Sequence, residues 1–248
     1  MTEHAAETEE TSTVVRVEDL DRQFGSVSVL EGVEFTAEAG TVTALIGPNG
    51  SGKTTLLQVV TGLLAPTDGS VTVAGTGERP VGYLPQDPAF RPSFTVRETL
   101  AFYGDLLAPA VDVAAAVDRV GLSAVADRRV DALSGGMLRL LGIAQAVLGD
   151  PSLVVLDEPT GDLDPRMTDY IFDVATDLAD EGRAVLLATH NLVGAERADQ
   201  VLLLDGGRVA YDGTPAEVTA ELDAESLAAA FLAAVGAEGP TVRAGRDG

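Results

Sequence analysis

The amino-acid sequence predicts an α/β fold with a mixed, mainly parallel central sheet, an antiparallel β portion near the N-terminus and an inserted helical subdomain. Short continuous apolar runs, such as residues 153–156 and 184–188, alternate with stretches of helical periodicity. Buried parallel strands and the helices that cover them give this pattern. Between about residues 87 and 150 the helical periodicity continues without such a run, so we expect the inserted subdomain there.

The first third of the chain predicts the antiparallel portion and the strand that leads to the main motif. Residues 14–20 alternate between apolar and polar types, and residues 27–33 and 71–73 are further strand candidates. Residues 42–46 are a continuous apolar run, and apolar residues return at helical spacing from Leu56 onward. We therefore expect a buried strand, a loop and a helix in that order, with a short apolar strand later at residues 81–84.

The second half of the chain predicts the remaining core elements. We expect a helix from residue 135 to about 149, followed by strands at 153–156 and 184–188 with a helix at 166–179 between them. A hairpin of residues 201–204 and 208–211 should then turn at Gly206-Gly207. One or two helices are expected in 215–235.

The chain is strongly acidic, with a formal net charge of −23 at pH 7. This charge disfavours non-specific binding to nucleic acid and to anionic lipid. Acidic surfaces, arginine in place of lysine and many small residues suit high salt, where ions screen the repulsion between carboxylates. A halophilic source is therefore an expectation, and an acidic bias from a GC-rich genome is the alternative.

The sequence predicts one cytoplasmic domain without disulfides. It has 248 residues, of which 46% are hydrophobic and none is cysteine, and no apolar run approaches the roughly twenty residues that span a bilayer. Residues 1–12 are expected to be a disordered acidic leader and not a signal peptide, residues 13–235 a single domain, and residues 236–248 a flexible tail.

A phosphate-binding loop follows the strand at residues 42–46. It matches the pattern G-x-x-x-x-G-K-[ST] at every fixed position. Its residues are Gly47, Pro48, Asn49, Gly50, Ser51, Gly52, Lys53, Thr54 and Thr55. Backbone N–H groups of such a loop surround phosphate oxygens, and the helix that follows adds the positive end of its dipole. A glycine-rich turn that binds nothing is the alternative, and the strand–loop–helix setting disfavours it.

Two side chains of this loop carry the expected chemistry. Lys53 should contact the β- and γ-phosphates, and the Thr54 hydroxyl should ligate Mg²⁺. Lys53 is also the only lysine among the 16 basic residues of the chain. A sequence that otherwise uses arginine keeps a lysine where the loop encloses a compact ammonium group.

Two carboxylates end the strand at residues 153–156. Asp157 follows a buried strand after a phosphate-binding loop, so we expect it to hold Mg²⁺ through water. Glu158 is one residue further on, where it would polarise a water for in-line attack on the γ-phosphate. A solvated acidic pair at the end of a strand is the alternative.

Two further polar residues end neighbouring strands of the predicted sheet. His190 closes the strand at 184–188 and should reach the γ-phosphate, since α/β sites form at the carboxyl ends of strands. Gln86 ends the strand at 81–84 and is placed to reach Mg²⁺ and the attacking water. A structural histidine and a solvated glutamine are the alternatives.

The stretch Leu133-Ser134-Gly135-Gly136-Met137 completes the pattern. It resembles the signature sequence of the ATP-binding cassette (ABC) family of ATPases. The order of motifs over about residues 13–215 is similar to that family throughout: phosphate-binding loop, Gln86, helical insert, signature, Asp157-Glu158, the D-loop with Asp164, and His190. At the start of a helix, Ser134 and the N–H groups of the two glycines also form an anion site.

The resemblance implies how ATP is bound. In this family two cassettes pack head to tail as a homodimer or a heterodimer, so that Ser134 and Gly136 of one copy cover the γ-phosphate held by Lys53 of the other. It also implies that Phe24 stacks on adenine, where Tyr is more usual; a core phenylalanine is the alternative. The implied ligands are ATP and Mg²⁺, the latter near Thr54, Gln86 and Asp157.

Three positions depart from the family pattern. Met137 stands where many members have Gln, and this form is common in single-cassette, exporter-like members. Asp162 stands in the D-loop where Gly is usual, and its charge could weaken dimer closure at low salt. Leu140 stands where the family often has a basic residue.

The implied function is the ATP-hydrolysing subunit of an ABC transporter, at the inner face of the cell membrane and in contact with it only through a separate permease. Residues 88–94, with Phe90 and Phe94, are either a landing surface for that permease or part of the core of the insert. The alternative function is a soluble ABC ATPase acting on DNA or ribosomes, which the short insert, the single cassette and the acidic charge disfavour. Export is the favoured direction of transport.

Overall fold

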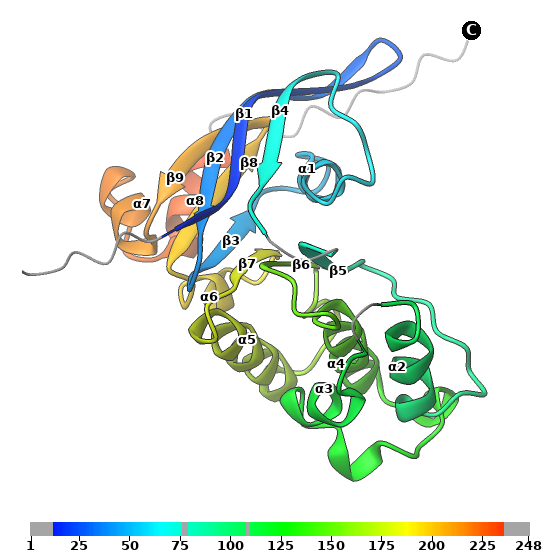
Figure 1. Ribbon diagram of the computed structural model, residues 1–248. Coiled ribbons are helices and arrows are strands. Elements are labelled where there is room, and N and C mark those ends of the chain that lie inside the picture. Colours follow the sequence, from blue (N-terminus) through cyan, green and yellow to red (C-terminus); the bar gives the residue numbers. More distant parts are fainter. Residues whose placement is uncertain (1–11, 76–78, 108–109, 236–248) are drawn as a thin grey trace, which may run out of the picture.

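The computed structural model describes residues 12–75, 79–107 and 110–235, and its named strands form two sheets (Figure 1). The smaller sheet is antiparallel, in the order β2-β1-β4, with β1 at Thr13–Phe24, β2 at Val27–Glu38 and β4 at Asp68–Val73. The predicted antiparallel portion is confirmed. The first two strands are longer than predicted, because register shifts after Val17 and Leu20 break the two-residue alternation.

The larger sheet has the order β5-β6-β7-β3-β8-β9. Its strands are β3 (Val42–Ile46), β5 (Val81–Leu84), β6 (Leu153–Asp157), β7 (Ala184–Ala188), β8 (Gln200–Asp205) and β9 (Arg208–Gly213). The first five strands in this order are parallel to one another, and only β9 runs antiparallel to its neighbour. The hairpin between β8 and β9 turns at Gly206 and Gly207, both with positive φ, as predicted.

Alternate side chains of the parallel strands enter two different cores. Along β6, Leu153 and Val155 pack with α1 (Lys53–Val60) and the inner face of the small sheet. Val154 and Leu156 point the other way, toward the remaining helices. Both faces of the sheet are therefore covered, which explains why its strands are continuous apolar runs.

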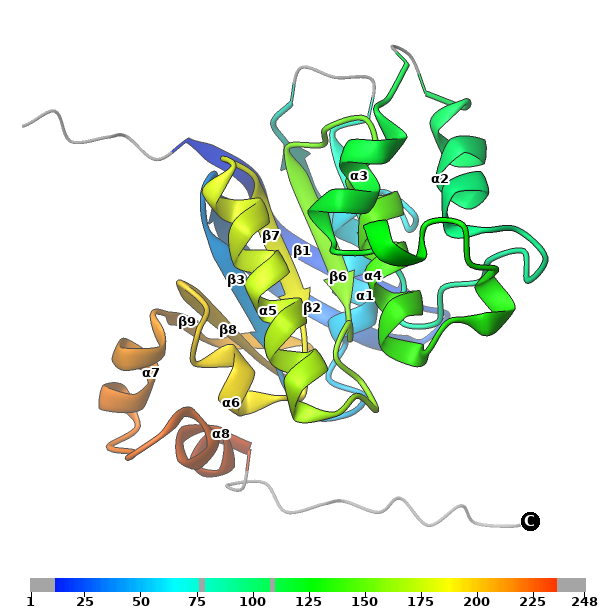
Figure 2. The same ribbon diagram turned by 90° about the horizontal axis from the view of Figure 1, so that it is seen from below.

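The other helices cover the second face and the two ends of the molecule. They are α2 (Val96–Gly104), α3 (Val113–Arg119), α4 (Gly135–Ala146), α5 (Pro165–Asp180), α6 (Leu192–Ala195), α7 (Pro215–Glu221) and α8 (Leu227–Val235). Figures 1 and 2 show α2, α3 and α4 grouped on the side of the large sheet that lies away from β1, β2 and β4. These helices fall within the predicted insert.

Two predictions concern residues that the structure leaves undescribed. The acidic leader, up to residue 11, and the tail from residue 236 lie outside the described residues. Within the described part, none of the helices has the length and apolar character needed to cross a membrane.

Candidate active site

The phosphate-binding loop connects β3 to α1, and Lys53 is the first residue of that helix. The Lys53 side chain is buried, and its Nζ donates to the carbonyl oxygens of Gly47 at 2.7 Å and of Pro48 at 3.2 Å. Burial lowers the pKa of Lys53, while the carboxylates of Glu158 and Asp157 oppose that shift. The ammonium group is thus held inside the loop by the backbone of the loop itself.

Asp157 lies at the end of β6, beside the start of α1. Its side chain is buried, and its Oδ1 accepts a hydrogen bond from the Thr54 hydroxyl at 3.3 Å. Burial is the largest cause of a raised pKa at Asp157, and the charge of Glu158 adds to it; the Thr54 hydrogen bond and the charge of Lys53 oppose it. Burial and the neighbouring Asp157 also raise the pKa of Tyr83 to about 12, so this phenol stays protonated.

Two buried oxygens near the loop have no hydrogen-bond partner among the described residues: Ser51 Oγ and Asp157 Oδ2. An unpaired buried polar group is costly, so such atoms are suited to contact a bound ligand. A buried carboxylate oxygen next to a threonine hydroxyl offers the hard oxygen donors that Mg²⁺ prefers, and nucleotide phosphates supply its remaining ligands in other proteins. The residues present therefore fit a magnesium–nucleotide complex.

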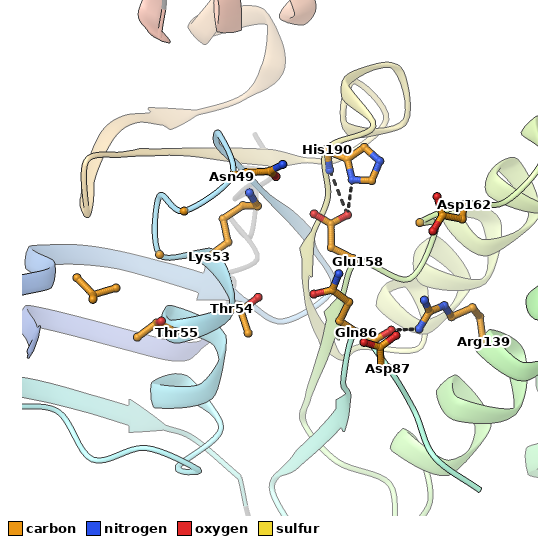
Figure 3. Close-up of a pocket in the computed structure, with 14 residues that line it drawn as sticks. Asn49, Lys53, Thr54, Thr55, Gln86, Asp87, Arg139, Glu158, Asp162 and His190 are labelled. Atoms are coloured by element: carbon orange, nitrogen blue, oxygen red, sulfur yellow. Dashed lines mark hydrogen bonds and ion pairs between the residues drawn. The ribbon is translucent and has the colours of Figure 1, made fainter. Parts of the chain in front are cut away.

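Glu158 and His190 form a close pair at the ends of β6 and β7 (Figure 3). Glu158 Oε2 lies 2.8 Å from His190 Nδ1 and accepts from the His190 backbone N–H at 3.3 Å. Glu158 has φ = 48°, an uncommon value for a residue other than glycine, and its N–H donates to the Ala188 carbonyl at 3.0 Å. The carboxylate is thus held in one orientation by the neighbouring strand.

A cleft of about 670 Å³ brings most of the predicted catalytic residues together. Figure 3 shows Lys53 and Thr54 facing Glu158, His190 and Gln86 across it. The residues that line it are Val29, Asn49, Gly50, Gly52, Lys53, Thr54, Thr55, Gln86, Asp87, Arg139, Glu158, Gly161, Asp162 and His190. Asp157 lies behind this lining, because it is buried against Thr54.

The signature residues do not line this cleft. Ser134 caps α4 by accepting from the Met137 N–H at 3.3 Å, and both Ser134 and Gly135 are exposed. The neighbouring Gly136 is buried under Met167 of α5; a Cβ added to it would lie 2.6 Å from Met167 Cγ. The start of α4 is therefore packed against α5 of its own chain on one side and open on the other.

The D-loop, residues 161–164, lies between the end of β6 and the start of α5. Asp164 caps α5 by accepting from the N–H groups of Arg166 at 3.0 Å and Met167 at 3.1 Å. Asp162 has φ = 59°, a conformation that Gly, Asn and Asp adopt most readily, so the replacement of the usual glycine needs no change in the loop. Its carboxylate lines the cleft and also a second cavity of about 290 Å³ with Gly135.

Phe24 lies apart from the cleft, at the end of β1. The residue is 45% exposed, so the alternative of a core phenylalanine is wrong. The Arg22 guanidinium lies 4.4 Å from the ring centroid. A cation stacked against an exposed ring fits a platform for a planar base, and that role stays a prediction.

Residues 88–94 contain one aromatic residue that packs on the core and one that is partly exposed. Phe90 is half-buried and packs against the larger core. Phe94 and Phe102 are partly exposed, make an edge-to-face pair at 6.3 Å, and share the Arg91 guanidinium at 5.0 and 4.8 Å. Phe90 thus belongs to the core, whereas Phe94 forms part of a surface together with Phe102 of α2 and Arg91.

Two residues near the site were missed by the sequence reasoning. Tyr83 lies beside Asp157, and Arg139 lines the cleft and donates to the backbone carbonyl of Gln86. The sequence did carry a signal for Arg139: it is a basic residue one position before Leu140, where the family often has a basic residue. The structure buries Leu140 in the core. A shift of one residue rotates a side chain by about 100° around a helix, and so the charge faces the cleft and not the core.

Comparisons with known proteins show the family of the chain. The family model described as ABC transporter matches residues 30–161. The chain is 34% identical over 224 residues to the Nod factor export ATP-binding protein I of Rhizobium etli. This alignment covers 85% of this chain and 71% of that protein. It is 37% identical to an ABC transporter ATP-binding/permease protein of Mycobacterium tuberculosis, but spans only 24% of the length of that protein.

Solved structures show the same fold. An ATP-binding subunit of an ABC transporter superposes with a TM-score of 0.78 at 27% identity, over 90% of this chain and 99% of that one. The cbiO1 subunit from Clostridium perfringens gives 0.75 at 28% identity, over 85% and 92%. Since the family model matches more than half of the chain and relatives align over most of it, this chain belongs to the ABC transporter family, among the ATP-binding domains whose hydrolysis of ATP drives transport.

Proposed function

We propose that the chain binds ATP with Mg²⁺ in the cleft between the phosphate-binding loop and the ends of β6 and β7. The buried, unpartnered Ser51 Oγ and Asp157 Oδ2 carry this proposal, because they lie where a phosphate and its cation would satisfy them. Lys53 and the N–H groups at the start of α1 would bind phosphate oxygens. Thr54 and Asp157 would hold Mg²⁺, with Gln86 near it, and the cation would supply charge neutralisation on the phosphates.

Glu158 is the proposed general base. Its carboxylate faces Lys53 across the cleft, where a water could lie between it and a bound γ-phosphate. His190 holds Glu158 through both Nδ1 and its backbone N–H, so it fixes the direction of the carboxylate. The side chain of His190 is 66% exposed, which leaves its Nε2 available to the γ-phosphate.

The second half of the ATP site is proposed to come from another copy of the same or a related chain. Ser134 and Gly135 are exposed and lie outside the cleft, so within one chain they have no phosphate to bind. A head-to-tail pair would place them over the ATP of the partner. ATP binding would then close the pair and hydrolysis would reopen it.

The proposed partner is a separate membrane permease, which would hold the chain at the inner face of the cell membrane. The partly exposed group of Arg91, Phe94 and Phe102 follows Gln86 in sequence and is a suitable surface for a cytoplasmic segment of that permease. Export is the favoured direction, since the Rhizobium etli relative is named as an export protein. A role on DNA or ribosomes finds no counterpart in these relatives.

The variant Glu158→Gln tests the proposal. It should retain ATP binding with Kd within about twofold of wild type, and lower kcat by about 10²–10⁴-fold, the range for loss of a general base. Size-exclusion chromatography with ATP and Mg²⁺ should show a stable dimer of the variant, and a monomer without ATP.

Glu221→Gln is the matched control, because Glu221 is exposed on α7, far along the chain from the cleft residues. Its Kd for ATP, its kcat and its elution in size-exclusion chromatography should match those of wild type. Hydrolysis by Glu158→Gln at the wild-type rate would contradict the assignment of the base, and a monomer with ATP bound would contradict the shared site.

A further inference from the structure

Helix α4 and strand β5 approach each other unusually closely. A Cβ added to Gly82 of β5 would lie 2.0 Å from the Ala146 carbonyl oxygen of α4. One turn earlier, a Cβ added to Gly142 would lie 2.3 Å from Leu84 Cδ1. The glycine of the strand thus lets it approach the backbone of the helix, and the glycine of the helix leaves room for the Leu84 side chain. The end of β5, which leads to Gln86, is therefore fixed relative to α4.

Arg139 continues this contact beyond the end of the strand. It precedes Gly142 by three residues, so both side-chain positions lie on the same face of α4. Its Nη1 donates to the backbone carbonyl oxygen of Gln86. Among the described residues no other donor reaches that oxygen. A charge-assisted bond to a carbonyl that has no other protein partner fixes the peptide plane of Gln86.

The carboxylates around Arg139 do not compete for it. Asp87 and Asp162 line the same two cavities as Arg139, yet none of the ion pairs in the described part of the chain involves this arginine. Its guanidinium is thus directed to the backbone of the Gln86 loop.

We propose that Arg139 is a positioning residue, which links the signature to the side chain of Gln86. Ser134, Gly135 and Gly136 form the first turn of the helix that carries Arg139. A shift of that turn would therefore move the Gln86 carbonyl, and with it the Gln86 side chain in the cleft. The inference rests on the proposed function: contact of the signature with the ATP of one site would align Gln86 at the other.

Steady-state hydrolysis by Arg139→Met, Arg139→Lys and the control Arg97→Met tests this link. Arg139→Met should lower kcat about tenfold and leave the Kd for ATP and the melting temperature close to wild type. Arg139→Lys should recover part of the rate, because an ammonium also donates to a carbonyl. Arg97 pairs with Asp127 on the exposed surface of the same helical region, so Arg97→Met should retain full activity.

A double-mutant cycle with Gln86→Ala separates positioning from a merely structural role. Gln86→Ala keeps the backbone carbonyl and removes the side chain that Arg139 is proposed to place. Arg139→Met should then lower kcat by less than twofold in the Gln86→Ala background. Additive losses, or an unchanged kcat in Arg139→Met alone, would overturn the inference. Wild-type protein that fails to hydrolyse ATP would contradict the proposed function instead.

Discussion

The phosphate-binding loop and the signature both start a helix, yet their surroundings are opposite. Lys53 and Asp157 are buried, and carbonyls or hydroxyls of the same chain bind them. Ser134 and Gly135 are exposed, and among the described residues no cation or carboxylate forms an ion pair or hydrogen bond with them. One helix start is a nearly complete anion site, whereas the other offers only backbone N–H groups and a hydroxyl.

In the proposed head-to-tail pair, this difference would let one chain supply halves of two different ATP sites. The buried half would bind phosphate groups by itself, since its charges are fixed before the ligand arrives. The exposed half has little affinity alone, because a helix N-terminus in water attracts an anion only weakly. Closure of two copies would thus depend on ATP that is already bound at the first half.

Replacement of Lys53 by Met should have the largest effect on the buried half. Loss of the ammonium should weaken ATP binding and lower kcat/KM by at least about 10²-fold, the scale for removal of one group that stabilises transition-state charge. Since Lys53 is the only lysine, amine acylation followed by peptide mapping reports on this residue directly. ATP should protect it, and full labelling in saturating ATP would contradict its contact with phosphate.

Alanine at Gly82 and at Gly135 should separate packing from binding. A Cβ at Gly82 would meet the Ala146 backbone carbonyl, which cannot move aside, so Gly82→Ala should lower the free energy of unfolding by about 1–3 kcal/mol. A Cβ at Gly135 would meet nothing closer than Leu163 Cδ2 at 3.8 Å. Gly135→Ala should therefore keep its stability in urea unfolding and lose ATP-dependent dimerisation. Equal unfolding midpoints for the two variants would contradict this distinction.

The pH dependence of stability tests the buried carboxylate. The pKa of Asp157 in the folded chain lies above its ordinary value of 3.8. The stability that this group contributes is therefore complete below pH 3.8 and is lost as pH rises through the folded pKa. Without Mg²⁺, Asp157→Asn should raise the melting temperature at pH 7 by a few degrees, and the difference should vanish toward pH 4.

Asp177→Asn is the control for this measurement, since Asp177 is exposed on α5. Its melting curve should follow wild type at every pH. A lower melting temperature of Asp157→Asn at pH 7 would show that the carboxylate stabilises the fold and would contradict the sign given above.

Asp162 offers the smallest and most specific test of the exposed half. Its carboxylate lines the cavity that also contains Gly135, where a second copy would approach. Asp162→Asn keeps a residue type that tolerates φ = 59° and removes the charge. It should raise hydrolysis about twofold at low salt, and the gain should disappear near 1 M salt, where the Debye length is about 3 Å. A gain that persists at high salt would contradict an electrostatic cause.

The sequence predicted the buried half better than its surroundings. The pattern of Lys53 and Thr54 lies within one strand–loop–helix unit, so local periodicity is enough to place it. Asp157, Glu158 and His190 each follow a fully buried apolar strand, and parallel strands bring their carboxyl ends to one edge of the sheet. These predictions needed only short-range patterns and one topological rule.

The contacts of Arg139 and Met167 could not be predicted in this way. Arg139 reaches Gln86 because Gly82 and Gly142 let α4 approach β5, and that distance is set by tertiary packing. Met167 covers Gly136 for a similar reason, since α5 begins beside the signature turn. No spacing within a single element of the sequence carries such information.

The alternation along β6 has a consequence for insertions and deletions. Both faces of this strand are apolar, so a slip by one residue would exchange the two sets of side chains between the two cores. It would also move Asp157 into the buried position of Leu156, or Ser152 into that of Leu153. The same slip would carry Asp157 about 3.3 Å along the sheet, out of reach of the Thr54 hydroxyl. A one-residue deletion in β6 would thus disturb the packing of the core and the geometry of Asp157 and Thr54 together.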